Sequence, residues 1–160
     1  MNNNTGFINL IDEKDLFKKL LWEYEFLIKN SESSFHAFNF FVTAFHLADW
    51  IYKGGTRNNE NYTNFVKDNI VISLAGQIAN GAKHFELKDK RYTEDKRGIK
   101  GIISDNGYVN DGYVQDAYLQ NRLIIKLDNQ AKSIIGESIE VIELADFIIN
   151  FYNKTFKRTI

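Results

Sequence analysis

Three stretches in the first half of the chain carry apolar residues at helical spacing, and they predict helices over Asp12–Lys29, Phe35–Lys53 and Tyr62–Phe85. The first is amphipathic, with Asp12 as its N-cap. Its charged residues fall largely outside the apolar face: Lys14, Lys18, Lys19, Glu23 and Glu25. The middle parts of the other two carry no charged residue, which is typical of helices in the centre of a bundle. Gly54-Gly55 predicts a stop for the second helix.

The pattern changes to strand-like segments in the second half of the chain. The charged stretch Lys88–Lys100 comes first. Strands are predicted over Ile99–Ser104, Tyr113–Gln120 and Leu123–Asp128, with Leu123, Ile125 and Leu127 on one face and a turn at Asp105-Asn106-Gly107. A short segment over Ser133–Ile135 follows. Ser138 then caps a final helix that ends near Phe156.

The order of elements predicts an α+β fold that is mainly α. We expect three helices, a small antiparallel β insertion over residues 88–136, and a C-terminal helix that closes the bundle. A length of 160 residues fits one domain over residues 1–160.

Composition excludes several classes of protein. The net charge of −1 argues against a strongly basic nucleic-acid protein, and the absence of cysteine excludes thiolate metal sites and cysteine nucleophiles. The start of the chain lacks the pattern of a secretory signal, and no apolar run reaches the length of a membrane span. We therefore expect a cytoplasmic protein without a membrane partner. The mixed-charge stretch Lys88–Lys100 fits either a solvated loop or a contact with a nucleic-acid backbone.

Two predicted helices each carry a stripe of polar side chains that are mostly neutral. In the third helix the stripe contains Asn69, Ser73, Gln77, Asn80 and His84. In the second helix it contains His36, Asn39, Thr43, His46 and Lys53, with Asp49 and Trp50 at its edges. Amides and imidazoles form hydrogen bonds without the cost of burying a permanent charge, so these stripes favour a cleft or an interface over an ordinary solvent face. The residues expected at an interface are His36, Asn39, Thr43, Trp50, Ser73 and Gln77.

The stripes leave three kinds of chemistry open. A metal site could use His46, Asp49 and His84, because His46 and Asp49 lie three residues apart on one helix face. Acid–base catalysis could use His84, with Asn80, Lys83 and His46 as further candidates. Plain packing and hydrogen bonding is the third reading. We predict no cofactor. A catalytic pair of His84 and His46 requires that the two side chains meet in the fold.

The run Ala79-Asn80-Gly81-Ala82-Lys83-His84 resembles the helical motif of the HEPN superfamily. Asn80 and His84 stand at the places of the motif's polar residue and histidine, whereas Ala79 occupies the place of its arginine. The resemblance implies a small helical bundle, a homodimer and, in active members, a metal-independent ribonuclease. Because alanine cannot bind a phosphate as arginine does, the same comparison argues against ribonuclease activity here. The segment over residues 35–87 is also similar to short, uncharacterised bacterial proteins.

These observations favour a HEPN-like binding or regulatory module with an RNA or protein partner, for instance in a bacterial defence or toxin–antitoxin system. The first alternative is a metal-independent ribonuclease that uses His84. The second is a metal-dependent bundle enzyme that uses His46, Asp49 and His84.

Overall fold

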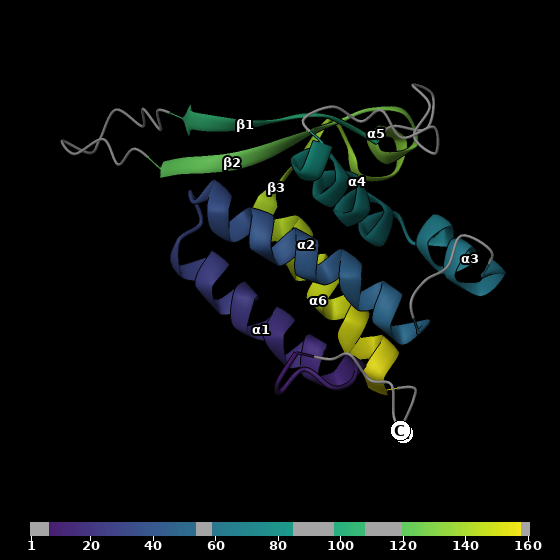
Figure 1. The fold of residues 1–160 in the computed structure, drawn as a ribbon. Helices are drawn as coiled ribbons and strands as arrows, with labels where there is room; N and C mark the ends of the chain where they lie inside the picture. Colours follow the sequence, from purple (N-terminus) through teal and green to yellow (C-terminus); the bar gives the residue numbers. More distant parts are fainter. Residues whose placement is uncertain (1–6, 54–58, 85–97, 108–119, 158–160) are drawn as a thin grey trace, which may run out of the picture.

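The computed structural model describes residues 7–53, 59–84, 98–107 and 120–157, without the side chains of residues 82–84, 106, 107 and 120. In these ranges the chain forms helices and one antiparallel sheet (Figure 1). The helices are α1 (Glu13–Lys29), α2 (Ser34–Ile51), α3 (Glu60–Asp68), α4 (Ile70–His84), α5 (Asn129–Ile135) and α6 (Val141–Lys157). The strands are β1 (Ile99–Gly107), β2 (Gln120–Leu127) and β3 (Ser138–Glu140).

Helices α1, α2, α4 and α6 form a bundle, and the sheet, in the order β1-β2-β3, lies along one side of it (Figure 1). Helix α2 has α1 on one side and α4 on the other, and it also contacts α6. The expected fold class, α+β and mainly α, is therefore confirmed.

One cluster of buried side chains joins the bundle to the sheet. Leu123, Ile125 and Leu127 of β2 are all buried, as their alternation predicts, and they face the helices. Tyr152 of α6 is fully buried, and its hydroxyl donates a 2.7 Å hydrogen bond to the carbonyl oxygen of Ala44 in α2. The polar end of this large side chain is thus satisfied within the core.

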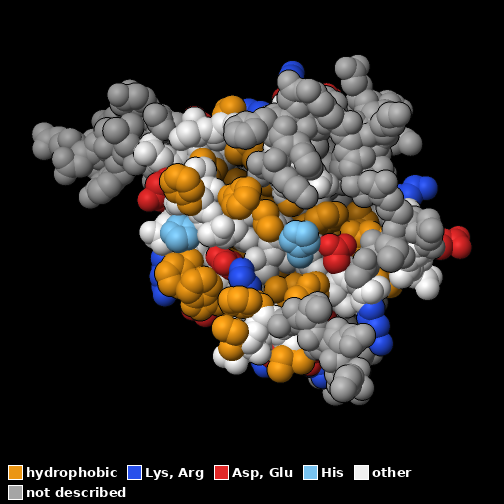
Figure 2. All heavy atoms as spheres, in the orientation of Figure 1, with side chains coloured by type: hydrophobic (Ala, Val, Ile, Leu, Met, Phe, Trp, Pro, Cys, Tyr) orange, Lys and Arg blue, Asp and Glu red, His pale blue; other side chains and the backbone are white. Residues whose placement is uncertain are grey.

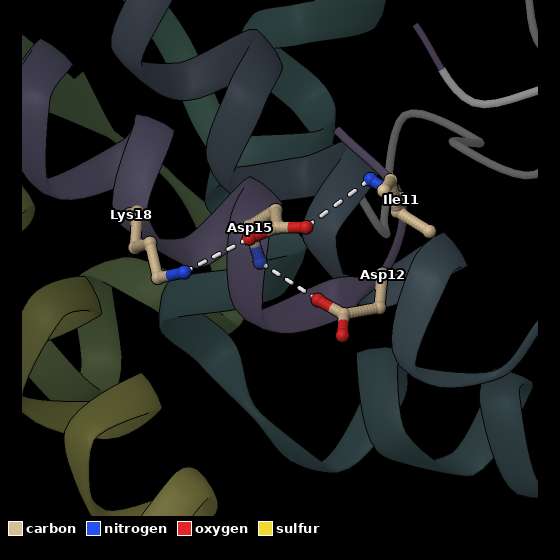
Figure 3. A network of polar contacts seen from close by, with 4 residues as sticks. All are labelled: Ile11, Asp12, Asp15 and Lys18. Atoms are coloured by element: carbon tan, nitrogen blue, oxygen red, sulfur yellow. Dashed lines mark hydrogen bonds and ion pairs between the residues drawn. The ribbon is translucent and has the colours of Figure 1, made fainter. Parts of the chain in front are cut away.

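The start of α1 is fixed by a small polar network (Figure 3). The Asp12 carboxylate accepts a 2.9 Å hydrogen bond from the Asp15 N–H, which confirms Asp12 as the N-cap. The Asp15 carboxylate accepts from the Lys18 ammonium at 2.9 Å and from the Ile11 N–H at 3.3 Å. The hydrogen bond from Lys18, followed by that from Ile11, lowers the pKa of Asp15.

The single helix predicted over Tyr62–Phe85 is wrong, because the chain forms α3 and α4 with a break at Asn69. Asn69 has an extended backbone with φ −116° and ψ 96°, and its side-chain amide donates a 2.6 Å hydrogen bond to the Phe65 carbonyl. Asparagine side chains compete with helical hydrogen bonds in this way, so the helix ends although the apolar spacing continues.

Three further expectations differ from the structure. Asp105-Asn106-Gly107 belongs to β1 and pairs with β2, so the predicted turn is wrong. Ser138 does not cap the last helix; it lies in β3 and pairs with Lys126 of β2, which extends the sheet beyond the expected boundary at residue 136. The short segment predicted over Ser133–Ile135 is the end of α5, whose N-cap is Asp128.

Several expected features lie outside the described residues. They are the Gly54-Gly55 stop, residues 88–97 of the charged stretch and residues 113–119 of the predicted second strand. Among the described helices, none combines the length and apolarity that crossing a bilayer requires.

Candidate functional site

The polar stripe of α2 lies along the junction with α1. Thr43 is buried, and its hydroxyl accepts a 2.8 Å hydrogen bond from the Lys19 ammonium of α1. The same ammonium lies 2.7 Å from the carboxylate of Glu23, whose residue is only 5% exposed. Thr43 therefore binds a neighbouring helix. At this point the stripe belongs to a contact between two helices of the same chain, which agrees with the reading of plain packing and hydrogen bonding.

Of the Lys19–Glu23–Thr43 cluster, the sequence pattern singled out Thr43 but neither Lys19 nor Glu23. The helical phase of Lys19 and Glu23 puts them among the charged residues that fall largely outside the apolar face of the first helix. Their spacing does predict the ion pair. The burial of Glu23 comes from the position of α2, which the spacing cannot show.

His46 and Asp49 form the second polar feature of α2. Nδ1 of His46 lies 3.0 Å from Oδ2 of Asp49, and the side chains are 57% and 27% exposed. A carboxylate in this position orients the imidazole and leaves Nε2 facing outward. Within the described ranges, no group of three or more histidine and carboxylate side chains could hold a metal ion. The third expected ligand, His84, has a side chain outside the described part.

In the polar stripe of α4, Gln77 contacts the start of the sheet. Gln77 is 3% exposed, and its Oε1 accepts a 2.8 Å hydrogen bond from the N–H of Gly98, just before β1. Ser73 and Asn80 are half-buried. The buried members of the two stripes thus bind different neighbours: Thr43 faces α1, whereas Gln77 faces the start of β1.

The HEPN-like motif lies in the second half of α4. Ala79, in the place of the motif's arginine, is 7% exposed and contributes to the buried interior. Asn80 beside it is half-buried and has an interaction partner. The side chains of Lys83 and His84 lie outside the described part, so their predicted roles stay predictions.

The register of α2 and α4 bears on the expected meeting of His46 and His84. A Cβ built on Gly76 would lie 2.6 Å from the Phe45 ring, so these two positions are opposite each other. Farther along, Gly81 lines the same groove as Ser34 and Phe38 at the start of α2. The two helices are therefore antiparallel. At 1.5 Å per residue, the backbone of His84 lies roughly 13.5 Å along the axis from the level of His46, which argues against a shared ligand.

Aromatic rings form a ladder across the outer surface of α1 and the start of α2. The ring centroids of Trp22 and Phe26 are 4.4 Å apart, and those of Phe26 and His36 are 5.8 Å apart. The Lys29 ammonium lies 6.0 Å from the centre of the Phe26 ring. We call these residues, Trp22, Phe26, Lys29 and His36, the ring ladder.

The surface around the ring ladder is unusually apolar. Trp22 is 55% exposed and Phe35 is 81% exposed, although the sequence predicted that aromatic residues of the second helix would be central. Figure 2 shows histidine side chains on this face among hydrophobic ones. Large exposed aromatic side chains that are grouped together mark binding surfaces more often than isolated ones do.

On the side of α1 toward α6, Tyr24 donates a hydrogen bond to the Asp146 carboxylate. Burial, followed by this hydrogen bond, raises the pKa of Tyr24 to about 12. Burial also raises the pKa of Tyr152. Both hydroxyls stay protonated near pH 7 and are poor candidates for acid–base chemistry. Their hydrogen bonds, to Asp146 and to the Ala44 carbonyl, join helices of the bundle.

Comparisons of the chain with protein-family models, with curated proteins and with solved structures found no match.

Proposed function

We propose that the chain is a HEPN-like binding module without the catalytic set of active HEPN proteins, and that it holds single-stranded RNA on the surface formed by α1 and the start of α2. The observation that carries this proposal is the ring ladder, in which the tilted rings of Trp22, Phe26 and His36 contact one another beside the Lys29 ammonium. Unpaired bases stack on exposed aromatic faces, and nearby cations attract the phosphate backbone.

Two observations support binding in preference to catalysis. Ala79 is buried, so the position that carries arginine in the resembled motif offers no cation to a phosphate. The His46–Asp49 pair has no third histidine or carboxylate near it within the described ranges that would complete a metal site. A ribonuclease that uses His84 and a metal-dependent enzyme are the alternatives that the experiment below distinguishes.

The resemblance adds two further parts to the proposal. Active members of the superfamily commonly work as homodimers, and we expect two copies of this chain to associate. A role in a bacterial defence or toxin–antitoxin system fits a module that binds RNA without cleaving it. A protein partner on the exposed aromatic surface is the competing occupant.

The test measures fluorescence anisotropy of a labelled single-stranded RNA and of the matching duplex at low salt. We expect the single strand to bind more tightly than the duplex, whose bases are already stacked. Trp22→Ala should weaken single-strand binding about tenfold, because stacking contributes roughly 1–3 kcal/mol per base. Phe147→Ala is the matched control, since Phe147 is a 44% exposed aromatic residue on α6, outside the ring ladder.

Gel analysis of the same samples, with and without chelator, separates the alternatives. Intact RNA in both conditions supports the binding module. Cleavage that resists the chelator supports the metal-independent ribonuclease, and cleavage that the chelator stops supports the metal-dependent enzyme. Absence of RNA binding, or equal loss in the Trp22→Ala and Phe147→Ala variants, contradicts the ring ladder as an RNA site. Light scattering of the free protein reports whether one or two chains are present.

A further inference from the structure

A groove of about 790 Å³ separates the sheet from the ends of two helices. Its walls come from the start of α2, the second half of α4, and strands β1 and β2. This volume lies within the range of roughly 300–1,000 Å³ that is typical of small-molecule sites. The groove is distinct from the ring ladder, because none of the ladder residues lines it.

The floor of the groove is apolar and belongs to the core. Phe41, Ile78, Leu123 and Val141 line it, and each of them is 9% exposed or less. An apolar floor at the bottom of an open groove favours a ligand with a hydrocarbon surface, because such a ligand releases the water that the floor contacts.

Ile102 shows that the groove leaves inward-facing apolar surface uncovered. It pairs with Ile125 of β2, so its side chain lies on the face of the sheet that packs on the helices. Ile125 is fully buried, yet Ile102 is 46% exposed. Phe38, on the α2 side of the groove, is 42% exposed. Two large apolar side chains therefore line opposite walls and remain in contact with water.

Charged side chains stand at the two ends of the groove. Lys100 lines the end near Gln77, and Glu32 lines the end near Ser34 and Ser104. The pairing of β1 with β2 is irregular between Ile99 and Gly101, and Lys100 is the extra residue at this bulge. Bulges re-aim a side chain in this way. In the part of the chain that the structure describes, no ion pair involves Lys100.

We propose that this groove binds an amphipathic carboxylate, such as a medium-chain fatty acid, with its carboxylate at Lys100 and its hydrocarbon chain over Phe41 and Ile102. Glu32 repels an anion at the opposite end, so the two charges fix the direction of the bound molecule. Along β1, the distance from Lys100 to Ser104 is about 13 Å at 3.3 Å per residue, which gives room for an extended hydrocarbon chain. The proposal is independent of RNA binding.

Isothermal titration calorimetry with decanoate, below its micelle concentration, tests the proposal, and decylamine serves as the probe of opposite charge. We expect saturable binding of one decanoate per chain and at least tenfold weaker binding of decylamine. Ile102→Asp should abolish decanoate binding. Ile134→Asp is the matched control, because Ile134 of α5 is a 57% exposed isoleucine that does not line the groove.

Lys100→Glu keeps the test informative if Ile102→Asp fails to fold, since Lys100 is exposed. This variant should reverse the preference, so that decylamine binds more tightly than decanoate. Absence of saturable decanoate binding to the unchanged protein overturns the proposal. So does equal loss of binding in the Ile102→Asp and Ile134→Asp variants, or an unchanged preference in the Lys100→Glu variant.

Discussion

Helices α1 and α4 pack on two sides of the same helix, α2, in different ways (Figure 1). Against α4, the Phe45 ring lies over Gly76, and the approach is so close that a Cβ at position 76 would lie 2.6 Å from the ring. Against α1, the contact includes a buried polar cluster in which Lys19 bridges Glu23 and Thr43. The junction of α2 with α4 depends on glycine at position 76, which has no side chain. The junction of α2 with α1 depends on the ion pair that compensates the charge of Glu23.

The difference shows what each junction tolerates. A close apolar contact has no room for added atoms, because overpacking forces side chains away from their preferred rotamers. A buried ion pair does not tolerate the loss of one partner, which leaves a charge without compensation. Substitutions of opposite kinds should therefore disrupt the two junctions.

The largest effect is expected for Gly76→Val at the junction of α2 and α4. The branched side chain would overlap the Phe45 ring, and we expect the free energy of unfolding to fall by about 3 kcal/mol, at the upper end of typical overpacking costs. Urea denaturation followed by circular dichroism measures the change.

Two further variants isolate the cause. Adding Phe45→Ala to Gly76→Val should recover part of the loss, since the overlapping ring is gone. Gly101→Val is the matched control, because nothing lies within 4 Å of a Cβ built at Gly101. If both glycine variants lose stability equally, the close approach of Phe45 to Gly76 is not what limits α2–α4 packing.

A smaller effect is expected for Lys19→Met at the junction of α1 and α2. The methionine keeps the apolar stem but leaves Glu23 buried without its cation. We expect a loss of about 2 kcal/mol, below the roughly 3–5 kcal/mol of fully buried pairs, because the Lys19 side chain is 36% exposed. Thr43→Val, which removes only the hydroxyl, should cost about 1 kcal/mol. Chemical denaturation at neutral pH measures both.

Lys18→Met is the control for the Lys19 variant. Lys18 also pairs with a carboxylate of α1, but its side chain is 75% exposed, so its removal should leave stability unchanged within error. Similar losses for the two lysine variants would show that burial of Glu23 does not set the strength of the α1–α2 junction.

Local signals allowed the prediction of α1, α2 and the buried face of β2. Asp12 and Ser33 cap the first two helices as their side-chain chemistry favours, and Leu123, Ile125 and Leu127 alternate as a half-buried strand requires. Where competing local preferences were close in energy, the prediction failed. Asn69 interrupts an apolar spacing that continues on both sides, and the serine at position 138 suits a strand as well as a cap.

The site was predictable in its chemistry but not in its geometry. Thr43 and Gln77 of the neutral polar stripes make hydrogen bonds within the chain, which agrees with the reading of plain packing, and the expected interface between two copies stays a prediction. Which neighbour each residue meets depends on how the helices pack, and this cannot be obtained from the spacing within one helix. The exposure of Phe35 and the burial of Glu23 also depend on how the helices pack, which the spacing within one helix does not show.

The smallest effect concerns the side of α1 toward α6, where Tyr24 donates a hydrogen bond to Asp146. Tyr24→Phe should cost about 1 kcal/mol or less at neutral pH. Its clearer signature is alkaline. The pKa of Tyr24 is about 12 in the folded protein, above the ordinary value of 10.0, so folding favours the neutral form. The stability from this preference is fully present below about pH 10 and is lost as the pH rises from 10 toward 12.

The Tyr24→Phe variant should therefore lose less stability between pH 10 and pH 12 than the unchanged protein, as measured by urea midpoints across this range. Tyr52→Phe is the control, because it keeps Tyr24 and should keep the full decline. Tyr152 is common to both variants, and its raised pKa contributes the same background to each. An equal decline in both variants would mean that the hydroxyl of Tyr24 titrates alike in the folded and unfolded chain. The contact with Asp146 would then be too weak to hold α1 against α6, and the buried Lys19–Glu23–Thr43 cluster would remain as the polar contact that positions α1 within the described part of the bundle.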